Sequence, residues 1–523
     1  MAAASSALLA QAVNILSIAD MQALDRSVIA DGMPSLLLME HAAAGMFRHV
    51  IRYARRGRSI IICGTGNNGG DGLALARLLV RSDVAADVLV IGTREHLSAD
   101  ARTNLSLLSS EGVDAAFIDE TSVDDACRRI LSSAVMVDAL FGTGVDRNIE
   151  GVPKRMVEAM NASKGIRISL DIPSGLPAIG SGSVCVKADH TITVGAPKDI
   201  FFLEPYTRFI GRLSVVPSMF PRERLRKPGA PMLLSARGFS KINCPDDAFA
   251  SKRSASVCII AGSEQYPGAA VLAASAVYRL GVGYIRLLVP YAIRDDIRKR
   301  LPPEVVTVGV GRKGDGHFSA PHIPQIEKEM KHARAVLIGC GVDRHAETGD
   351  LLNALVPRID RPLVVDADGL YFISRNKELM PKLSSSTVLT PHVDEFSRLV
   401  DIPADEIQSD AFNKLAAFRE RTKAGVVLKS AVTFISDDAG IAVHARPQYG
   451  MGKAGMGDVL AGIITGLLAR GFSMHDAMTL GVYAHGKAFR IMRTRSSADE
   501  IQPSDVSRAV GHALRSIRTR IIK

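Results

Sequence analysis

The chain has 523 residues, about three times the usual length of a domain, so two or three domains are expected. Hydrophobic residues at 47% and charged residues at 23% are values of a folded globular protein, and they exclude a disordered or fibrous chain. The longest apolar run, residues 459–469, is far below the ~18 residues of a membrane span and is predicted to be a buried helix.

The net charge is +10, from 64 basic and 54 acidic residues. There is no tryptophan, aromatic residues make up 5%, and no basic stripe carries interleaved aromatic side chains. This pattern disfavours nucleic-acid binding. A mildly positive field suits small molecules that carry phosphate groups, and solvated surface accounts for most of the charges.

The six cysteines form no C-x-x-C pair and show no cysteine–histidine spacing typical of zinc. Residues 1–16 are rich in alanine and have no basic leader, so they are predicted to form a leading helix rather than a signal peptide. The reducing cytoplasm is the expected location.

Both halves of the chain alternate short β-branched runs with helical segments, which predicts parallel sheets with crossover helices. In the first half, strands are predicted at residues 59–63, 88–91, 134–137, 166–170 and 190–194. In the second half, they are predicted at residues 257–261, 284–289, 335–339, 363–366, 387–389 and 425–429. The proline-rich, charged segment 217–253 is predicted to connect the halves, which gives two α/β domains, residues 1–224 and 225–523.

A glycine-rich loop follows the first predicted strand, where Gly64 begins the sequence GTGNNGGDG. Its glycines fit the spacing G-x-G-x-x-G, which lets the backbone approach a phosphate at a helix N-terminus. By itself this signal is weak, but the loop also holds Asn67, Asn68 and Asp71, which a simple turn does not need. The alternative is that Asp71 only caps the helix. Residues 93–95, Thr-Arg-Glu, stand where an acidic ribose partner would follow, and they leave that role ambiguous.

Two further predicted strands end in polar residues beside glycine turns. Asp138 closes one strand before the sequence FGTG, and Asp171 closes the next before Ile-Pro-Ser174-Gly. Because the carboxyl ends of parallel strands meet in one crevice, Asp71, Asp138, Asp171 and Ser174 are expected to converge. Each aspartate alone could be a turn former, but three at strand ends favour a site. Such oxygen ligands suit a weakly demanding cation better than zinc.

These motifs and the sequence ADHTITVGAPK, which ends at Lys198, resemble the NAD(P)H-hydrate epimerase domain over residues 15–217. The resemblance implies a Rossmann-like three-layer sandwich that interconverts the R and S epimers of hydrated NADH and NADPH (NADHX and NADPHX). It also implies potassium held by Asn68, Asp138 and Ser174. The implied contacts of the hydrated nucleotide are Asn67, Asn68, Gly69, Gly70, Asp71, Gly142, Thr143, Gly144, Val145, Asp146, Arg147, Asn148 and Asp171. Pro177 departs from this family, which usually has Asp after Ser-Gly-Leu.

The substrate of that family carries a hydroxyl on C6, next to a ring nitrogen. Epimerisation could therefore pass through loss and return of water at C6. Asp171 is expected to be the catalytic residue that manages the proton.

A second glycine turn, at residues 455–457, precedes Asp458 and opens the apolar helix predicted at 459–469. Free N–H groups at that helix end form an anion hole, and Asp458 could deprotonate a hydroxyl that attacks a phosphoryl group. The alternative is that Asp458 only caps the helix. Other polar residues close predicted strands, among them Asp366, His392 and Lys429. His392 alone could be structural, and Lys429 could simply pair with a carboxylate.

This half resembles the NAD(P)H-hydrate dehydratase domain, of ribokinase-like α/β fold, over residues 238–517. The resemblance rests on stretches such as PGAAVLAA from Pro267, LTPH ending at His392 and AGMGDVLAG from Ala454. It implies that ADP or ATP, with magnesium, phosphorylates the C6 hydroxyl of the S epimer and that phosphate is then eliminated, with Asp458 as the catalytic base. The implied hydrate contacts are Ala270, Gly341, His392 and Asp458. The implied adenine-nucleotide contacts are Lys429, Ser430, Ala431, Val432, Thr433 and Gly457.

The chain departs from the dehydratase pattern at Cys340, Val393, Ser430, Lys453 and Met456. Of these, Ser430 and Lys453 could change nucleotide affinity or the choice between ADP and ATP. Two alternatives stay open: a small-molecule kinase fused to a nucleotide-binding domain, and an epimerase whose second domain only binds. The expected partners are NADHX, NADPHX and ADP or ATP, with no nucleic acid and no membrane, and a homo-oligomer is expected.

Overall fold

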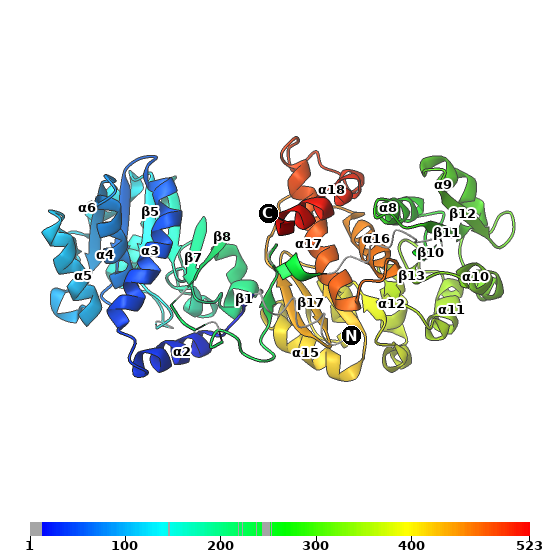
Figure 1. The fold of residues 1–523 in the computed structure, drawn as a ribbon, viewed down its shortest axis with the longest axis horizontal. Helices are drawn as coiled ribbons and strands as arrows, with labels where there is room; N and C mark the ends of the chain where they lie inside the picture. The colour runs from blue at the N-terminus through cyan, green and yellow to red at the C-terminus, as the bar shows by residue number, and fades with distance from the viewer. Residues whose placement is uncertain are drawn as a thin grey trace. The chain divides into compact units, whose positions relative to one another are not determined.

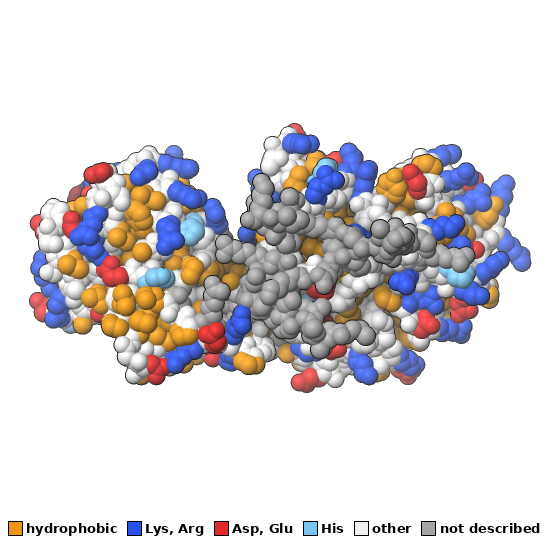
Figure 2. Space-filling view, viewed as in Figure 1, with side chains coloured by type: hydrophobic (Ala, Val, Ile, Leu, Met, Phe, Trp, Pro, Cys, Tyr) orange, Lys and Arg blue, Asp and Glu red, His pale blue; other side chains and the backbone are white. Residues whose placement is uncertain are grey.

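A computed structural model describes residues 13–144, 147–217, 219–221, 223–236, 238–242, 252 and 254–522. The chain forms two compact units, residues 14–230 and residues 231–523 together with 1–13 (Figure 1). Each unit is described by itself. None of the described helices is long and apolar enough to cross a membrane. Figure 2 shows Lys and Arg side chains scattered among acidic ones on the visible face, not gathered in a stripe.

The first unit contains a parallel sheet of seven strands in the order β4-β3-β2-β5-β6-β7-β8. The strands are β2 (Ser59–Cys63), β3 (Ala86–Ile91), β4 (Ala116–Ile118), β5 (Val135–Ala139), β6 (Ile166–Leu170), β7 (His190–Val194) and β8 (Arg212–Val216). The order reverses between β2 and β5, as in the Rossmann fold. This reversal leaves a crevice at the carboxyl ends of these two strands.

Helices cover both faces of this sheet. On one face lie α3 (Ser35–Ala54), α4 (Asn67–Val80) and α5 (Ala99–Ser110), which pack with alternate strand residues such as Ile61 and Cys63. On the other face α6 (Val123–Leu131) and α7 (Gly151–Ala162) pack with Ile60 and Ile62. Burial on both sides explains the uninterrupted apolar strands and confirms the three-layer sandwich. A further helix, α2 (Ile18–Ala30), packs through Met21 and Val28 in a separate small cluster.

The second unit contains an eleven-stranded sheet in the order β1-β9-β18-β17-β16-β15-β14-β13-β10-β11-β12. Its parallel part comprises β10 (Ser256–Ile260), β11 (Tyr284–Pro290), β12 (Val305–Val310), β13 (Ala335–Ile338), β14 (Leu363–Val365), β15 (Thr387–Leu389) and β16 (Gly425–Leu428). An antiparallel hairpin, β17 (Thr433–Asp437) and β18 (Gly440–His444), extends it, followed by β9 (Met232–Leu233) and β1 (Val13–Asn14). The strand order again reverses, here between β10 and β13.

One face of this sheet is covered by α8 (Pro267–Tyr278), α16 (Met456–Ala469), α17 (Met474–Met492) and α18 (Pro503–Ile522), which share one core with the strands. Figure 1 shows α10 (Ile323–Met330), α11 (Ala346–Leu355), α12 (Asp368–Arg375) and α15 (Ala411–Arg421) on the opposite side of the strands. The remaining helices are α9 (Arg294–Arg300), α13 (Val393–Val400) and α14 (Ala404–Ser409). The α/β fold predicted for this half is confirmed.

All eleven predicted strands are present, with bounds shifted by at most two residues at an end. Seven of the described strands were not predicted, namely β1, β4, β8, β9, β12, β17 and β18. Strands β4, β8 and β12 lie at sheet edges and are only partly buried, so their apolar pattern is weaker. Strands β1 and β9 have two residues each, and the buried hairpin β17–β18 carries polar residues such as Ser436 and Asp437 that interrupt its apolar pattern. The buried helix predicted at 459–469 is confirmed as part of α16.

The helix predicted over residues 1–16 is wrong where the structure describes it. Val13–Asn14 is a strand, and Leu16 bridges to Lys198. The helix starts only at Ile18, because Ser17 Oγ accepts a hydrogen bond from the backbone N–H of Asp20 at 3.0 Å and caps that end. Residues 1–12 lie outside the described chain.

The close packing of α8 on α16 depends on a glycine. A Cβ on Gly462 would lie 2.5 Å from the backbone oxygen of Ala273, whereas a Cβ on Gly268 of α8 would meet nothing within 4 Å. We expect Gly462→Ala to destabilise the second unit by about 1–3 kcal/mol. The matched change Gly268→Ala should be neutral or stabilising by up to about 1 kcal/mol, because alanine favours helix. Chemical denaturation of the full chain and the two variants checks this, and equal effects of the two changes would contradict it.

Candidate functional site

A cavity of about 680 Å³ opens in the first unit. Its walls come from the loops after β2, β5, β6 and β7 and from α2 and α3. It therefore lies where the strand order reverses, which is the usual ligand position in an open α/β sheet.

The glycine loop after β2 leaves no room for a side chain at its tightest point. A Cβ on Gly69 would lie 1.9 Å from the backbone oxygen of Gly64. Helix α4 starts at Asn67 with Gly66 as its cap, so Asp71 stands in the second turn. The capping alternative for Asp71 is therefore wrong, and this residue lines the cavity instead.

Asp138 is buried at the end of β5 and is enclosed by hydroxyl groups. Ser169 Oγ donates to one carboxylate oxygen at 2.7 Å, and Ser174 Oγ donates to the other at 2.5 Å. Burial raises the pKa of Asp138, although these hydrogen bonds oppose the shift. Ser174 Oγ also accepts from the backbone N–H of Phe141 at 2.9 Å, and the Phe141 carbonyl accepts from Asn68 Nδ2 at 3.0 Å. The other amide atom, Asn68 Oδ1, is buried and has no hydrogen-bond partner among the described residues.

Asp171 follows β6 with a left-handed φ of 62°, which non-glycine residues rarely adopt. Lys198 Nζ donates to Asp171 Oδ1 at 2.5 Å and to Thr193 Oγ1 at 2.7 Å. Thr193 Oγ1 in turn donates to Asp171 Oδ1 at 3.1 Å. Lys198 is 1% exposed, so its ammonium group serves this carboxylate and not the solvent. Strained backbone and a buried ion pair together fix the Asp171 carboxylate at the cavity wall.

Three more carboxyl groups, those of Asp25, Asp71 and Asp100, line the cavity with Asp171. Burial and the charge of Asp171 raise the pKa of Asp25 to about 6. Burial and the charges of Asp171 and Asp25 raise the pKa of Asp71 well above its usual range. Perturbed acids of this kind concentrate at catalytic and binding sites.

Most of the nucleotide contacts predicted for this half line the cavity, namely Asn67, Asn68, Asp71, Gly142, Thr143, Gly144, Arg147 and Asp171. Gly69 and Gly70 are buried in the first turn of α4, and Asn148 is exposed outside the lining. Val145 and Asp146 lie outside the described residues. Residues 93–95 do not line the cavity.

Asp25, Asp100 and Lys198 line this cavity although the sequence did not predict them as site residues. One feature of the sequence could have indicated Lys198: it directly follows the apolar segment TITVGAP. A lysine within such a buried segment needs a charged or polar partner. Asp25 and Asp100 stand in ordinary helical sequence, and only the folded chain brings them to Asp171.

A second cavity, of about 600 Å³, lies in the second unit beside the N-terminus of α16. Gly455 caps this helix with a left-handed φ of 95° and without a side-chain hydrogen bond, and Asp458 is the third helical residue. The capping alternative for Asp458 is therefore wrong. The free N–H groups of the first turn and the Asp458 carboxylate lie at the same cavity.

A lysine–aspartate pair lies close to the first turn of α16, where a Cβ on Gly457 would be 3.1 Å from Lys429 Nζ. Lys429 Nζ donates to Asp366 Oδ1 at 2.8 Å, and Thr390 Oγ1 donates to the same oxygen at 2.7 Å. The expectation that Lys429 pairs with a carboxylate is confirmed, and both residues of the pair line the cavity. Although burial opposes the charge of Lys429, the carboxylates of Asp366 and Glu395 raise its pKa.

Asp458 has the electrostatic surroundings of a general base. Burial and the neighbouring charge of Asp366 raise its pKa to about 7. Burial likewise raises the pKa of Glu395 to about 7. A carboxyl group with a pKa near neutrality accepts a proton effectively at physiological pH.

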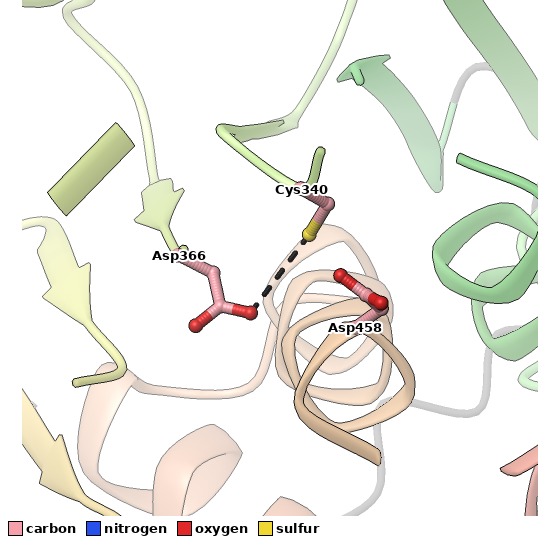
Figure 3. A group of neighbouring side chains, drawn as sticks. All are labelled: Cys340, Asp366 and Asp458. Carbon is pink, nitrogen blue, oxygen red and sulfur yellow. Dashed lines mark hydrogen bonds between the residues drawn. The ribbon is translucent and has the colours of Figure 1, made fainter. Parts of the chain in front are cut away.

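Cys340 follows β13 and lies next to Asp366 and Asp458. Its thiol donates to Asp366 Oδ2 at 3.9 Å, and Figure 3 shows its sulfur, Asp366 and Asp458 pointing toward one another. Burial and the charges of Asp458 and Asp366 raise the pKa of Cys340 well above its usual range. The thiol was known from the sequence only as a departure from the family pattern.

Most of the contacts predicted for this half line the cavity, namely His392, Lys429, Ser430, Ala431, Thr433, Gly457 and Asp458. Val432, Ala270 and Gly341 are buried outside the lining. His392 also has the structural role weighed above, because its Nδ1 accepts from the backbone N–H groups of Asp394 and Glu395 at the start of α13.

Two of the residues that depart from the family pattern, Lys453 and Ser430, form hydrogen bonds with nearby backbone oxygens. Lys453 Nζ donates to the backbone oxygens of Ala498, Asp499 and Ile501, at 2.6–3.2 Å. Ser430 Oγ donates to the backbone oxygen of Val432 at 2.5 Å. Both polar groups thus stabilise loops at the edge of the cavity.

Two family models match the chain. The one described as YjeF-related protein N-terminus matches residues 35–200, and the one described as NAD(P)H-hydrate dehydratase matches residues 257–511. The bifunctional NAD(P)H-hydrate repair enzyme of Thermofilum pendens is 31% identical over 97% of both chains, and that of Moorella thermoacetica is 30% identical over 91% of both. Among solved structures, the ADP/ATP-dependent NAD(P)H-hydrate dehydratase of Bacillus subtilis, co-crystallized with ATP and Mg²⁺, is 23% identical and covers 56% of this chain and 100% of its own, with a TM-score of 0.47.

The raised pKa of Asp25 predicts a gain in stability from its neutralisation. Because the folded pKa of about 6 exceeds the usual 3.8, ionisation of Asp25 costs stability above that range. We expect Asp25→Asn to raise the free energy of unfolding at pH 7.5 by about 1–3 kcal/mol. The gain should disappear as the pH falls through 6 to 4. Thermal unfolding of the wild-type chain and of Asp25→Asn, at pH 7.5 and at pH 4, measures this gain in stability.

Asp20→Asn is the matched control in the same helix. Hydrogen bonds from Lys227 lower the pKa of Asp20, so its neutralisation should not stabilise the fold. A gain of the same size in Asp20→Asn, or a gain in Asp25→Asn that persists at pH 4, would contradict the assignment.

Proposed function

The chain belongs to the family of bifunctional NAD(P)H-hydrate repair enzymes, and we propose that its two cavities catalyse the two successive reactions of that repair. The first unit, residues 14–230, interconverts the R and S epimers of NADHX and NADPHX. The second unit, which comprises residues 231–523 together with 1–13, uses ADP or ATP to dehydrate the S epimer to NADH or NADPH. The observation that carries the proposal is Asp458, with a pKa of about 7, at the anion-binding end of α16 and next to the Lys429–Asp366 pair.

In the first cavity, Asp171 is the group proposed to move the proton. Loss of the C6 hydroxyl as water requires a proton on the departing oxygen, and return of water to the other face releases one. Lys198 and Thr193 hold the carboxylate in one position throughout. Asp25 and Asp71, with raised pKa values, surround it with groups that can hold protons near neutral pH.

The oxygen cluster behind this cavity fits potassium. Asn68 Oδ1 is buried without a partner, and Asp138 offers one negative charge enclosed by Ser174 and Ser169. Hard oxygen donors with few charges suit a weakly demanding cation better than zinc. Asn68, Asp138 and Ser174 would hold the ion, which would supply positive charge next to the bound nucleotide.

In the second cavity, Asp458 is proposed to take the proton of the C6 hydroxyl while that oxygen attacks the terminal phosphoryl group. Lys429 and the free N–H groups of α16 bind the phosphate oxygens. This transfer releases AMP from ADP, or ADP from ATP. Elimination of the phosphate from C6, with loss of a proton from the neighbouring ring carbon, then restores the dihydronicotinamide. Magnesium would arrive on the nucleotide phosphates and would neutralise part of their charge, and the carboxylates of Asp366 and Asp458, which line the cavity, would offer it oxygen ligands.

The structure bears on the alternative in which the second unit only binds. Lys453 and Ser430, which motivated that alternative, make backbone hydrogen bonds at the cavity edge and leave Asp458 and Lys429 in place. This arrangement favours a catalytically active second unit. The cytoplasmic location and the homo-oligomer stay predictions.

Asp171→Asn should separate the two reactions. From a mixture of R and S NADHX with nucleotide, we expect the wild-type chain to restore all of the dihydronicotinamide absorbance. The variant should stop at the S fraction, because its epimerisation slows by about 10²–10⁴-fold. Complete recovery at the wild-type rate would contradict the role of Asp171.

Asp458→Asn should abolish the second reaction alone. Starting from pure S NADHX, the wild-type chain should recover absorbance only with ADP or only with ATP present, which also identifies the phosphoryl donor. The variant should lose about 10²–10⁴-fold in rate. Its epimerase activity, followed by the separation of the two epimers, is the internal control. Wild-type epimerisation without any nucleotide-dependent recovery would favour a binding role for the second unit.

A further inference from the structure

Cys340, Asp366 and Asp458 gather three metal-binding atoms from distant parts of the second unit. Each offers one ligand atom, a thiol sulfur or a carboxylate oxygen, and these atoms all lie within 4.8 Å of one another (Figure 3). Cys340 follows β13, Asp366 follows β14 and Asp458 stands in the first turn of α16. We propose that these three residues form a binding site for a divalent cation of the zinc class.

The distances fit such an ion. Zinc bonds of about 2.3 Å to sulfur and 2.0–2.2 Å to oxygen place two tetrahedral ligands about 3.5 Å apart. Cys340 Sγ and Asp366 Oδ2 are 3.9 Å apart. The distances from these two atoms to the Asp458 carboxylate are within 4.8 Å. Side-chain rotations that bring the three ligand atoms closer by up to about 1.3 Å would therefore close the site around an ion.

The charges fit as well. A Cys340 thiolate and the two carboxylates carry three negative charges, and Lys429, which contacts Asp366 Oδ1 at 2.8 Å, carries one positive charge. A divalent cation therefore neutralises the cluster. As the sulfur–metal bond forms, the thiol proton leaves to the solvent.

The ligand atoms, one sulfur and two carboxylate oxygens, determine which kind of ion the site prefers. Magnesium and calcium take oxygen ligands, whereas thiolate ligands select zinc and softer ions. Three protein ligands leave a fourth position open, and Asp366 and Asp458 both line the cavity from which an ion would enter. Cysteine spacing gave no hint of this site, because only one of its ligands is a cysteine.

The consequence for the enzyme rests on the function proposed above. An Asp458 carboxylate that binds a cation cannot accept the proton of the C6 hydroxyl. Zinc should therefore inhibit dehydration while epimerisation in the other unit continues.

Cobalt(II) chloride tests the site directly on the full chain without nucleotide or hydrate. We expect one equivalent to give the charge-transfer absorption of a cobalt–thiolate bond. Competition by zinc chloride against a chromogenic chelator then gives the affinity. Cys340→Ser and Cys340→Ala should remove the absorption and weaken zinc binding by about 100-fold or more, which exceeds the loss expected when a residue that only supports a metal ligand is changed. Thermal unfolding establishes that at least one of the two variants is folded.

Two control variants distinguish this site from other places where a metal could bind. Cys127→Ser removes a half-buried thiol of the first unit, and His317→Ala disrupts the stacked His317–His345 pair beside Glu347. Both should keep the cobalt–thiolate absorption. Its absence from the wild-type chain, its persistence in a folded Cys340 variant or its loss in Cys127→Ser would overturn the proposal. These outcomes do not depend on catalysis, so they are separate from a failure of the proposed function.

Discussion

Each unit depends on one lysine ammonium group held against an aspartate carboxylate at the carboxyl end of its parallel sheet. In the first unit Lys198 contacts Asp171, and in the second Lys429 contacts Asp366. Removing either lysine would leave a buried carboxylate without its counter-charge, which is among the most costly single changes in a protein. The two pairs thus make it possible for further acidic groups to stand in the same cavities.

Those further acidic groups lower the stability of the fold when they are ionised, because burial and neighbouring charges disfavour their charged forms. Around Asp171 the pKa values of Asp25 and Asp71 are raised, and around Asp366 those of Asp458 and Glu395 are raised. In each cavity several carboxyl groups lie close enough together to raise one another's pKa, although one of them is paired with a lysine. Folding alone would not favour such an arrangement, whereas acids that exchange protons near neutral pH are typical of catalytic sites. Carboxyl groups with raised pKa values beside a lysine–aspartate pair are therefore the physical feature that both sites share.

The sequence predicts the strands, the glycine turns and the aspartates at the strand ends, because these features are local. Burial on both faces makes the parallel strands continuous apolar runs, and the chain then has to turn at glycines such as Gly64 and Gly455. Residues that join a site only through tertiary packing cannot be predicted in this way. Asp25 reaches Asp171 from α2, and Cys340 reaches Asp458 across two elements far apart in sequence.

The sequence around a residue also cannot show whether its side chain caps a helix, lines a cavity or does both. The capping alternatives for Asp71 and Asp458 fail because Gly66 and Gly455 take the cap positions, whereas His392 does cap its helix while lining the cavity. The helix predicted for the N-terminal segment fails at Val13–Asn14 because pairing in a sheet overrides the local preference of an alanine-rich stretch.

The departures from the dehydratase pattern differ in what they touch. Lys453 and Ser430 donate to backbone oxygens, so their polar groups are satisfied within the loops that carry them. Cys340 alone among these three faces the carboxylates that the proposed reaction needs, because its thiol donates to Asp366 and stands next to Asp458. In the cation site proposed above, this thiol gives the cavity a soft ligand next to the base Asp458. This chain is therefore expected to differ from its relatives in its response to soft cations before it differs in the reaction itself.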